Sequence, residues 1–260
     1  MKKICFFLVI VLIILSVILF SVENKNNLKV KKKEEVKIKE KIKTDNVEYK
    51  LKDGETFIKK TKTGMNLTKY NGAYYVNGIM IVNKTYNLDS TYTPLYPYKE
   101  ITSDYLYGAD YIDKTTYLAF LDMQRDAKKA GYNLYLSSGY RSYKVQVDLY
   151  NNYVARDGKN QADTYSARPG YSEHQSGLCF DMNGTNANFF NTDIGKWVFN
   201  NYYKYGFILR FPEGKENETG YQFEAWHYRY VGKSLAKKLY NNGDIISLES
   251  YLGVSSNYSG

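Results

Sequence analysis

The sequence is poor in the residues that cross-link chains or bind metals: its 260 residues include only 2 Cys, 2 His, 4 Pro and 2 Trp. Cys5 lies in an apolar N-terminal segment, which leaves Cys179 alone in the rest of the chain and excludes a disulfide-stapled fold. Few prolines among 19 glycines exclude a collagen-like chain. A hydrophobic content of 43% with 29 Tyr excludes a disordered protein and is enough for one sizeable core.

Positive charge is scarce outside the N-terminal part, although the formal net charge is +9. Residues 23–69 hold 15 Lys against 8 acidic residues, and Lys2 and Lys3 add two more positive charges. Residues 70–260 contain 19 basic and 19 acidic residues and are therefore neutral. A nucleic-acid-binding domain concentrates its positive charge on the folded surface, where it faces phosphates. The neutral body argues against a nucleic-acid partner.

The N-terminus contains one long uncharged apolar run, residues 4–22 (ICFFLVIVLIILSVILFSV). A helix rising about 1.5 Å per residue could cross a bilayer over this length, which also exceeds the usual signal-peptide core of about 7–15 residues. We therefore expect residues 1–22 to be an uncleaved signal anchor, with a cleaved signal peptide as the alternative. Residues 23–69 are expected to form a solvated Lys/Glu-rich linker.

Residues 70–260 carry the patterns of a single α+β domain, with a small, mostly antiparallel sheet flanked by helices. Helices are expected over residues 114–130, 142–158, 191–206 and 232–243, and strands near 133–139, 177–182, 207–212 and 226–230. A loop is expected from residue 161 to residue 174. The absence of a regular alternation of strands and helices argues against a parallel sheet.

The two histidines each have a carboxylate nearby in the sequence. Asp181 follows His174 by seven residues, and Glu224 precedes His227 by three. A catalytic zinc site needs three protein ligands and an open position for water. Two histidines and one carboxylate meet this count and leave one carboxylate as a base. Cys179 would share a strand face with Asp181, so it is either a thiol ligand or a small buried apolar residue.

Four blocks of sequence surround these residues: residues 137–146 (SSGYRSYKVQ), 166–181 (SARPGYSEHQSGLCFD), 203–214 (YKYGFILRFPEG) and 224–232 (EAWHYRYVG). In this order they resemble the bacterial zinc D-alanyl-D-alanine carboxypeptidases, the VanY-like family that includes the L,D-carboxypeptidases of peptidoglycan. The family pattern S-x-H-x-x-G-x-A-x-D is met by Ser172, His174, Gly177 and Asp181, with Cys179 where Ala is usual. Ala225 stands where the family typically has Pro in E-P-W-H.

The resemblance implies one zinc ion bound by His174, Asp181 and His227, with Glu224 as the general base. In a regular strand, a spacing of three would place Glu224 and His227 on opposite faces. We therefore expect a bend or a strand end between them.

The resemblance also implies which residues hold the substrate. Arg141 would neutralise charge on the tetrahedral intermediate or bind the terminal carboxylate of the substrate, both suited to a planar guanidinium. Gln146 and Ser172 match positions that hold the end of the substrate. Trp226 and Tyr221 are expected to wall the pocket, although core packing would explain these aromatic residues equally well.

The function expected from the resemblance is removal of a C-terminal D-alanine from peptidoglycan stem peptides, at a D,D or an L,D bond. The alternatives are an endopeptidase that cuts inside the stem peptide and a non-catalytic wall-binding or metal-binding module. Glu224 and Arg141 argue against a pure binder, which needs no base beside a metal. We expect a monomer anchored in the cell membrane by one span, with its catalytic domain outside, or else secreted and wall-associated. Nine Lys in residues 23–43 conflict with this orientation under the positive-inside rule.

Overall fold

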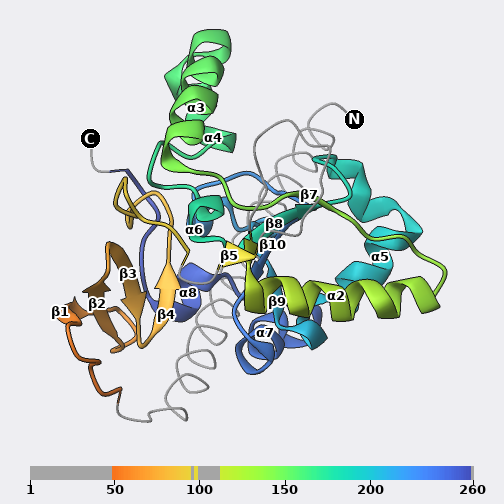
Figure 1. Ribbon diagram of the computed structural model, residues 1–260, viewed down its shortest axis with the longest axis horizontal. Helices are drawn as coiled ribbons and strands as arrows, with labels where there is room; N and C mark the ends of the chain where they lie inside the picture. Colours follow the sequence, from red (N-terminus) through yellow and green to blue (C-terminus); the bar gives the residue numbers. More distant parts are fainter. Residues whose placement is uncertain (1–48, 95–96, 99–111, 259–260) are drawn as a thin grey trace, which may run out of the picture. The chain divides into compact units, whose positions relative to one another are not determined.

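The computed structural model describes residues 49–94, 97–98 and 112–258, and these form an α+β domain built on antiparallel sheets (Figure 1). The predicted signal anchor and most of the predicted linker lie outside the described residues. Within the described part, no helix has both the length and the apolar character needed to span a membrane.

A four-stranded antiparallel sheet occupies the centre of the domain, with strand order β7-β8-β10-β9 (Figure 1). Its strands are β7 (Leu136–Ser138), β8 (Cys179–Met182), β9 (Phe207–Leu209) and β10 (His227–Tyr230). In the register of β8 and β10, His227 lies opposite Asp181 and Tyr228 lies opposite Phe180. Because side chains alternate along a strand, Asp181 and His227 point to one face, and Phe180 and Tyr228 to the other.

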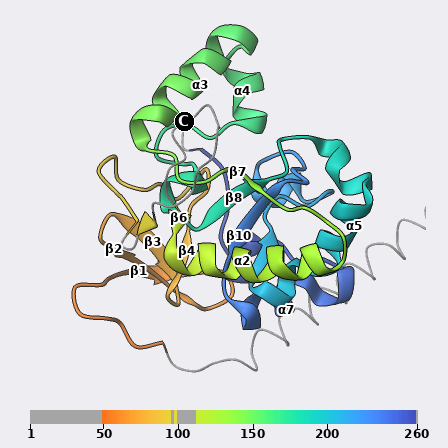
Figure 2. The same ribbon diagram turned by 45° about the vertical axis from the view of Figure 1, so that its right-hand side comes forward.

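The second of these faces builds the main core. Phe180 is fully buried, and its ring centroid lies 5.2 Å from that of Phe120 on α2 (Lys114–Lys129) and 5.0 Å from that of Phe207 on β9. Figure 2 shows α2 running alongside this sheet. The helix begins where predicted, because the Asp113 side chain accepts hydrogen bonds from the backbone N–H groups of Thr115 and Thr116. The sheet therefore has one packed face and one face that carries the predicted site.

A second antiparallel sheet, of strands β1 (Thr56–Lys60), β2 (Asn66–Tyr70), β3 (Ala73–Val76) and β4 (Ile79–Ile81), precedes the central one. Asn-Gly pairs with positive φ join β2 to β3 and β3 to β4, as tight hairpin turns require. The prediction of a linker through residue 69 is therefore wrong for its last part, since residues 56–69 lie in or between strands. The lysines of β1 led to this error, because a charged segment is typical of a linker. They are compatible with a strand here, since β1 lies at the edge of the sheet and is exposed along its whole length.

The helices differ from prediction in two places. The expected loop over residues 161–174 overlaps α4 (Lys159–Tyr165), which follows the predicted helix α3 (Tyr143–Asp157). The helix expected over residues 191–206 is broken into α5 (Asp193–Phe199) and η3 (Tyr202–Tyr205).

Two asparagines cause this break. The Asn200 and Asn201 side-chain amides donate to the carbonyl oxygens of Lys196 and Trp197, at 2.9 and 2.6 Å. Such local bonds compete with continuation of the helix. The remaining described elements are β5 (Pro97–Tyr98), β6 (Ile112–Asp113), η1 (Glu173–Ser176), η2 (Ala187–Asn191), α6 (Glu216–Thr219), α7 (Lys233–Tyr240), η4 (Asn241–Gly243) and α8 (Leu248–Leu252).

The core contacts of Phe180 lead to a stability prediction. We expect Phe180→Ala to lower the free energy of unfolding by about 3–5 kcal/mol, because it leaves a cavity among aromatic rings. Leu118→Ala is the control, since Leu118 is 50% exposed on α2. Urea unfolding followed by circular dichroism measures both variants. Equal losses in the two variants would contradict the assignment of Phe180 to the core.

Candidate metal centre and active site

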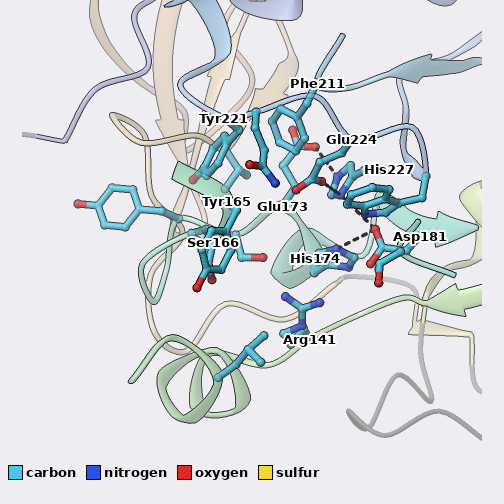
Figure 3. A pocket seen from close by; sticks show the side chains of 18 of the residues that line it. Arg141, Tyr165, Ser166, Glu173, His174, Asp181, Phe211, Tyr221, Glu224 and His227 are labelled. Carbon is cyan, nitrogen blue, oxygen red and sulfur yellow. Dashed lines mark ion pairs between the residues drawn. The ribbon is translucent and has the colours of Figure 1, made fainter. Parts of the chain in front are cut away.

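Four of the predicted residues converge on the open face of the central sheet (Figure 3). Nε2 of His174, on η1, lies 3.5 Å from Oδ1 of Asp181 on β8. Nδ1 of His227, the first residue of β10, lies 3.3 Å from the same oxygen and 3.5 Å from Oε2 of Glu224. All four side chains are buried or nearly so. The predicted ligand set and base thus lie together.

An acceptor oxygen lies on the outer side of each histidine, which leaves the inner nitrogen free to bind a metal. Nδ1 of His174 lies 2.7 Å from the carbonyl oxygen of Gly139, so Nδ1 carries the proton and Nε2 keeps its lone pair. Nε2 of His227 makes no hydrogen bond to a described residue, but it lies 3.5 Å from the Oε2 carboxylate oxygen of Glu173, whose negative charge favours the proton on Nε2 and the lone pair on Nδ1. A histidine ligand whose second nitrogen faces an acceptor is the usual arrangement at metal sites.

The buried atoms at this site that lack a hydrogen-bond partner in the described part of the chain are suited to bind a cation. Oδ1 of Asp181 is buried and accepts no hydrogen bond from any described residue, although an unpaired buried carboxylate is costly. Burial alone would raise the pKa of the Asp181 carboxyl, but His174 and His227, when protonated, hold it well below its usual range. A bound cation would take over that role and leave the histidines neutral. Two imidazole nitrogens and a carboxylate oxygen match the donor set of catalytic zinc. The residues present therefore fit a zinc ion.

The turn η1 that presents His174 depends on a glycine. Gly177 has φ of +70°, and a Cβ at this position would lie 2.7 Å from Cγ of Pro94. The carbonyl oxygen of His174 accepts hydrogen bonds from the backbone N–H groups of Gly177, at 3.2 Å, and Arg141, at 3.1 Å. The backbone of Arg141 is thereby fixed beside the first ligand.

A turn separates Glu224 from His227, which confirms the predicted bend. The N–H of His227 donates to the carbonyl oxygen of Glu224 at 3.4 Å, and β10 begins only at His227. The two side chains can therefore approach each other despite their spacing of three. Burial raises the pKa of Glu224 to about 7, and a cation bound beside it would lower this value. A carboxylate whose pKa lies at or somewhat below neutral is suited to act as a general base.

Behind the site lies a buried ion network that the sequence did not reveal. Oε1 of Glu173 accepts hydrogen bonds from Arg210 Nε at 2.8 Å and from Arg229 Nη1 at 2.9 Å. Arg210 also donates two hydrogen bonds to Glu249, at 2.8 and 2.6 Å. These four side chains are at most 2% exposed. The signal that could have revealed it is an arginine directly after the apolar strand β9 (Arg210) and another among the aromatic residues of β10 (Arg229).

The network assigns Glu173 a positioning role. Both arginines donate to Oε1, which leaves Oε2 for Nε2 of His227. Burial would raise the pKa of Glu173, but the two arginines hold it well below its usual range. A fixed negative charge next to Nε2 keeps the proton on that nitrogen and directs Nδ1 toward Asp181.

A pocket of about 260 Å³ opens onto the metal site and is lined by Arg141, Ser172, Tyr221 and Trp226, all predicted to contact substrate. Figure 3 shows the Arg141 guanidinium pointing toward His174. The aromatic residues that the sequence analysis missed in this lining are Tyr153, Tyr165, Tyr171 and Phe211. Tyr171 directly precedes Ser172 of the histidine motif and Phe211 lies in the block 203–214, so their positions were a usable signal, whereas Tyr153 and Tyr165 reach the pocket only in the folded chain.

The contacts of Gln146 differ from the predicted substrate contact. Its side chain is buried, and Gln146 is not among the residues that line the pocket. Its Oε1 accepts a hydrogen bond from Arg141 Nη1 at 3.0 Å, and its Nε2 donates to the Ala167 carbonyl oxygen at 2.6 Å. Gln146 therefore orients Arg141, and both its polar atoms are used by the protein.

The family model and the curated relatives that match this chain are all described as carboxypeptidases. Residues 109–233 match the family described as VanY, D-alanyl-D-alanine carboxypeptidase. The YodJ protein of Bacillus subtilis is 42% identical over 184 residues, which are 67% of each chain. A D-alanyl-D-alanine carboxypeptidase of Enterococcus faecium is 35% identical over 166 residues, 61% of this chain and 52% of that one. The chain thus spans about two thirds of the first relative and half of the second.

Solved structures of similar fold include three peptidases. The LdcB LD-carboxypeptidase matches with a TM-score of 0.64 and 37% identity, over 74% of this chain and 95% of that one. The pneumococcal L,D-carboxypeptidase DacB matches with a TM-score of 0.60 and 35% identity, over 75% and 98%. The D,D-pentapeptidase VanY of a VanB-type resistance cassette, solved with Zn(II), has a TM-score of 0.55 and 32% identity, over 66% and 97%.

The role assigned to Glu173 can be separated from a purely structural one. We expect Glu173→Gln to lower the free energy of unfolding by about 3–5 kcal/mol, because two buried arginines lose their shared anion. We also expect zinc affinity to fall about 10–100-fold, because His227 loses its fixed partner. Competition with a chromophoric chelator measures the affinity, and urea unfolding measures the stability.

Glu249→Gln is the matched control, since Glu249 pairs with Arg210 and not with His227. It should lose comparable stability and keep its zinc affinity. Equal zinc affinity in the two variants would contradict the positioning role.

Proposed function

Since this chain belongs to the VanY family of D-alanyl-D-alanine carboxypeptidases, we propose that it is a zinc-dependent carboxypeptidase that removes the C-terminal D-alanine from peptidoglycan stem peptides. The observation that carries the proposal is the approach of His174 Nε2 and His227 Nδ1 to one unpaired oxygen of Asp181, at 3.5 and 3.3 Å. Glu224 lies beside this group in the same pocket.

The chain supplies a base and an anion-binding group on either side of the metal ligands. Zinc bound here would polarise the scissile carbonyl and lower the pKa of the attacking water. Glu224 accepts the proton from that water and passes it to the amine of the departing D-alanine. Its Oε2, 3.5 Å from His227 Nδ1, is already next to the ligand set.

Arg141 is suited to hold the charged end of the substrate. Gln146 fixes its Nη1, and its Nε is buried with no hydrogen-bond partner among the described residues. A guanidinium with a free N–H forms strong paired hydrogen bonds with a carboxylate or with the developing oxyanion. We propose that the free carboxylate of the terminal D-alanine binds here, which would restrict cleavage to the last residue.

Of the two candidate bonds, we propose the L,D bond of the tetrapeptide as the preferred one. The observation in its favour is that LdcB and DacB, both described as L,D-carboxypeptidases, align over 74% and 75% of this chain. The D,D-pentapeptidase VanY aligns over 66%. More of this chain therefore has a counterpart in the L,D enzymes.

The proposed substrate lies outside the cytoplasmic membrane, so the proposal also places the catalytic domain there. Residues 4–22 would hold it at the membrane, or would be removed during secretion. We further propose that the protein acts as a monomer.

The activity is tested with a mixture of equal amounts of tetrapeptide and pentapeptide muropeptides and the zinc-loaded protein. We expect mass spectrometry to show loss of one alanine from the tetrapeptide, faster than from the pentapeptide. Glu224→Gln should slow the reaction about 10²–10⁴-fold, because a neutral amide cannot accept the proton. Removal of zinc by a chelator should stop the reaction, and added zinc should restore it.

Other product patterns would separate the alternatives. Loss of alanine from the pentapeptide alone would replace the L,D assignment by a D,D one. Cleavage inside the stem would indicate an endopeptidase. If neither muropeptide changes, the carboxypeptidase proposal is wrong and a binding module takes its place.

The contact between Gln146 and Arg141 leads to a prediction about coupling. We expect Arg141→Ala to lower kcat/KM about 10²–10³-fold, as for loss of one oxyanion donor. Gln146→Ala should have a smaller effect, and it should add little in the Arg141→Ala background because it acts through Arg141. Kinetics of the two single variants and the double variant measure the coupling. Fully additive effects would mean that Gln146 contacts the substrate independently.

A further inference from the structure

Cys179 lies next to the metal ligands, and the sequence left open whether it is a thiol ligand or a small buried apolar residue. It is two residues before Asp181 on β8, so both side chains point to the same face of the central sheet. In the register with β10, Cys179 lies opposite Arg229 and Asp181 lies opposite His227. The Cys179 side chain is fully buried and forms no disulfide.

The thiol is close to both histidine ligands. Donor atoms of His174, Cys179 and His227 all lie within 4.8 Å of one another, as in a metal site. The same two imidazoles approach Asp181, whose Oδ1 has no hydrogen-bond partner within the described part of the chain. Cys179 does not line the pocket, so its sulfur faces the histidines from the side closed to solvent.

We propose that Cys179 is a fourth protein donor to the metal ion held by His174, Asp181 and His227. This inference rests on the proposed zinc site and adds to it a ligand that the family pattern, with Ala at this position, does not contain. On metal binding the S–H bond breaks, a sulfur–metal bond forms, and the proton leaves to solvent. The two negative charges of the carboxylate and the thiolate then balance the two positive charges of a divalent ion.

A thiolate changes which metals the site prefers. Soft sulfur donors favour zinc, cadmium and cobalt over magnesium and manganese. A site with four protein donors also retains its ion more firmly than one with three, and the attacking water would then be a fifth ligand, a coordination number that catalytic zinc can reach. We therefore expect a higher zinc affinity than in the variant with alanine at position 179.

Cobalt(II) gives this proposal an optical readout that does not depend on activity. The metal-free full chain in detergent is titrated with Co²⁺ alone, and the absorption spectrum is recorded. We expect visible d–d bands from the bound ion and a near-ultraviolet sulfur-to-cobalt charge-transfer band. Cys179→Ala should keep the d–d bands, lose the charge-transfer band and bind zinc at least about tenfold more weakly, since even an outer partner of a ligand contributes that much.

Two variants make the result specific. Cys179→Ala introduces the residue usual in the family at this position, which makes misfolding a poor explanation for any loss of signal. Cys5→Ala is the matched control, because Cys5 is the other cysteine of the chain. The charge-transfer band should persist in this control.

The outcomes distinguish this inference from the proposed function. Cobalt d–d bands without a charge-transfer band, or with a band that disappears in Cys5→Ala and persists in Cys179→Ala, would overturn the thiol ligand and leave the zinc site standing. A chain that takes up no cobalt or zinc would overturn the zinc site and the thiol ligand together.

Discussion

The buried pairing of Glu173 with Arg210 and Arg229 is the constraint on which the rest of the domain depends. Charged groups this deep are stable only when each has a partner, so the segments that carry them must meet in one arrangement. Glu173 lies on η1, and the two arginines lie at the end of β9 and on β10. Arg210 reaches Glu249 on α8, and Arg229 donates to the Met80 carbonyl oxygen of the second sheet. One network thus joins the histidine turn, both sheets and the C-terminal helix.

The charge balance of this network explains why the site beside it needs a cation. Two arginines and two glutamates compensate one another, so the network supplies no net positive charge to the adjacent carboxylates. Asp181 and Glu224 lie outside it, and Oδ1 of Asp181 accepts no hydrogen bond within the described residues. A metal ion would provide the missing charge where three donor atoms already converge. Glu173 links the two systems, because one of its oxygens belongs to the network and the other faces His227.

The sequence predicts the site better than the scaffold because the site is written in short motifs. Histidine and acid within seven residues indicate a metal site, the family resemblance implies which residues are the ligands and the base, and the spacing of Glu224 and His227 predicts the turn before β10. The ion network joins residues far apart in the chain, such as Glu173 and Arg229, and becomes visible only once strand register is known. Local composition was misleading where tertiary contacts decide the secondary structure. The Lys-rich stretch expected as a linker forms β1 and β2, and a polar stretch expected as a loop forms part of α4.

The turn before His227 shows how the fold can replace a residue that the family usually supplies. Proline at the second position of a turn fixes φ in advance, and this chain has Ala225 there. The backbone on either side is instead held from outside the turn. Glu224 N–H donates to the Phe211 carbonyl oxygen at 3.1 Å, and the Trp226 carbonyl oxygen accepts from Met182 N–H at 3.0 Å. Ala225 itself is buried in the core. Both residues that flank Ala225 are hydrogen-bonded to neighbouring segments. The Glu224 side chain therefore remains oriented toward the metal ligands although position 225 has no proline ring.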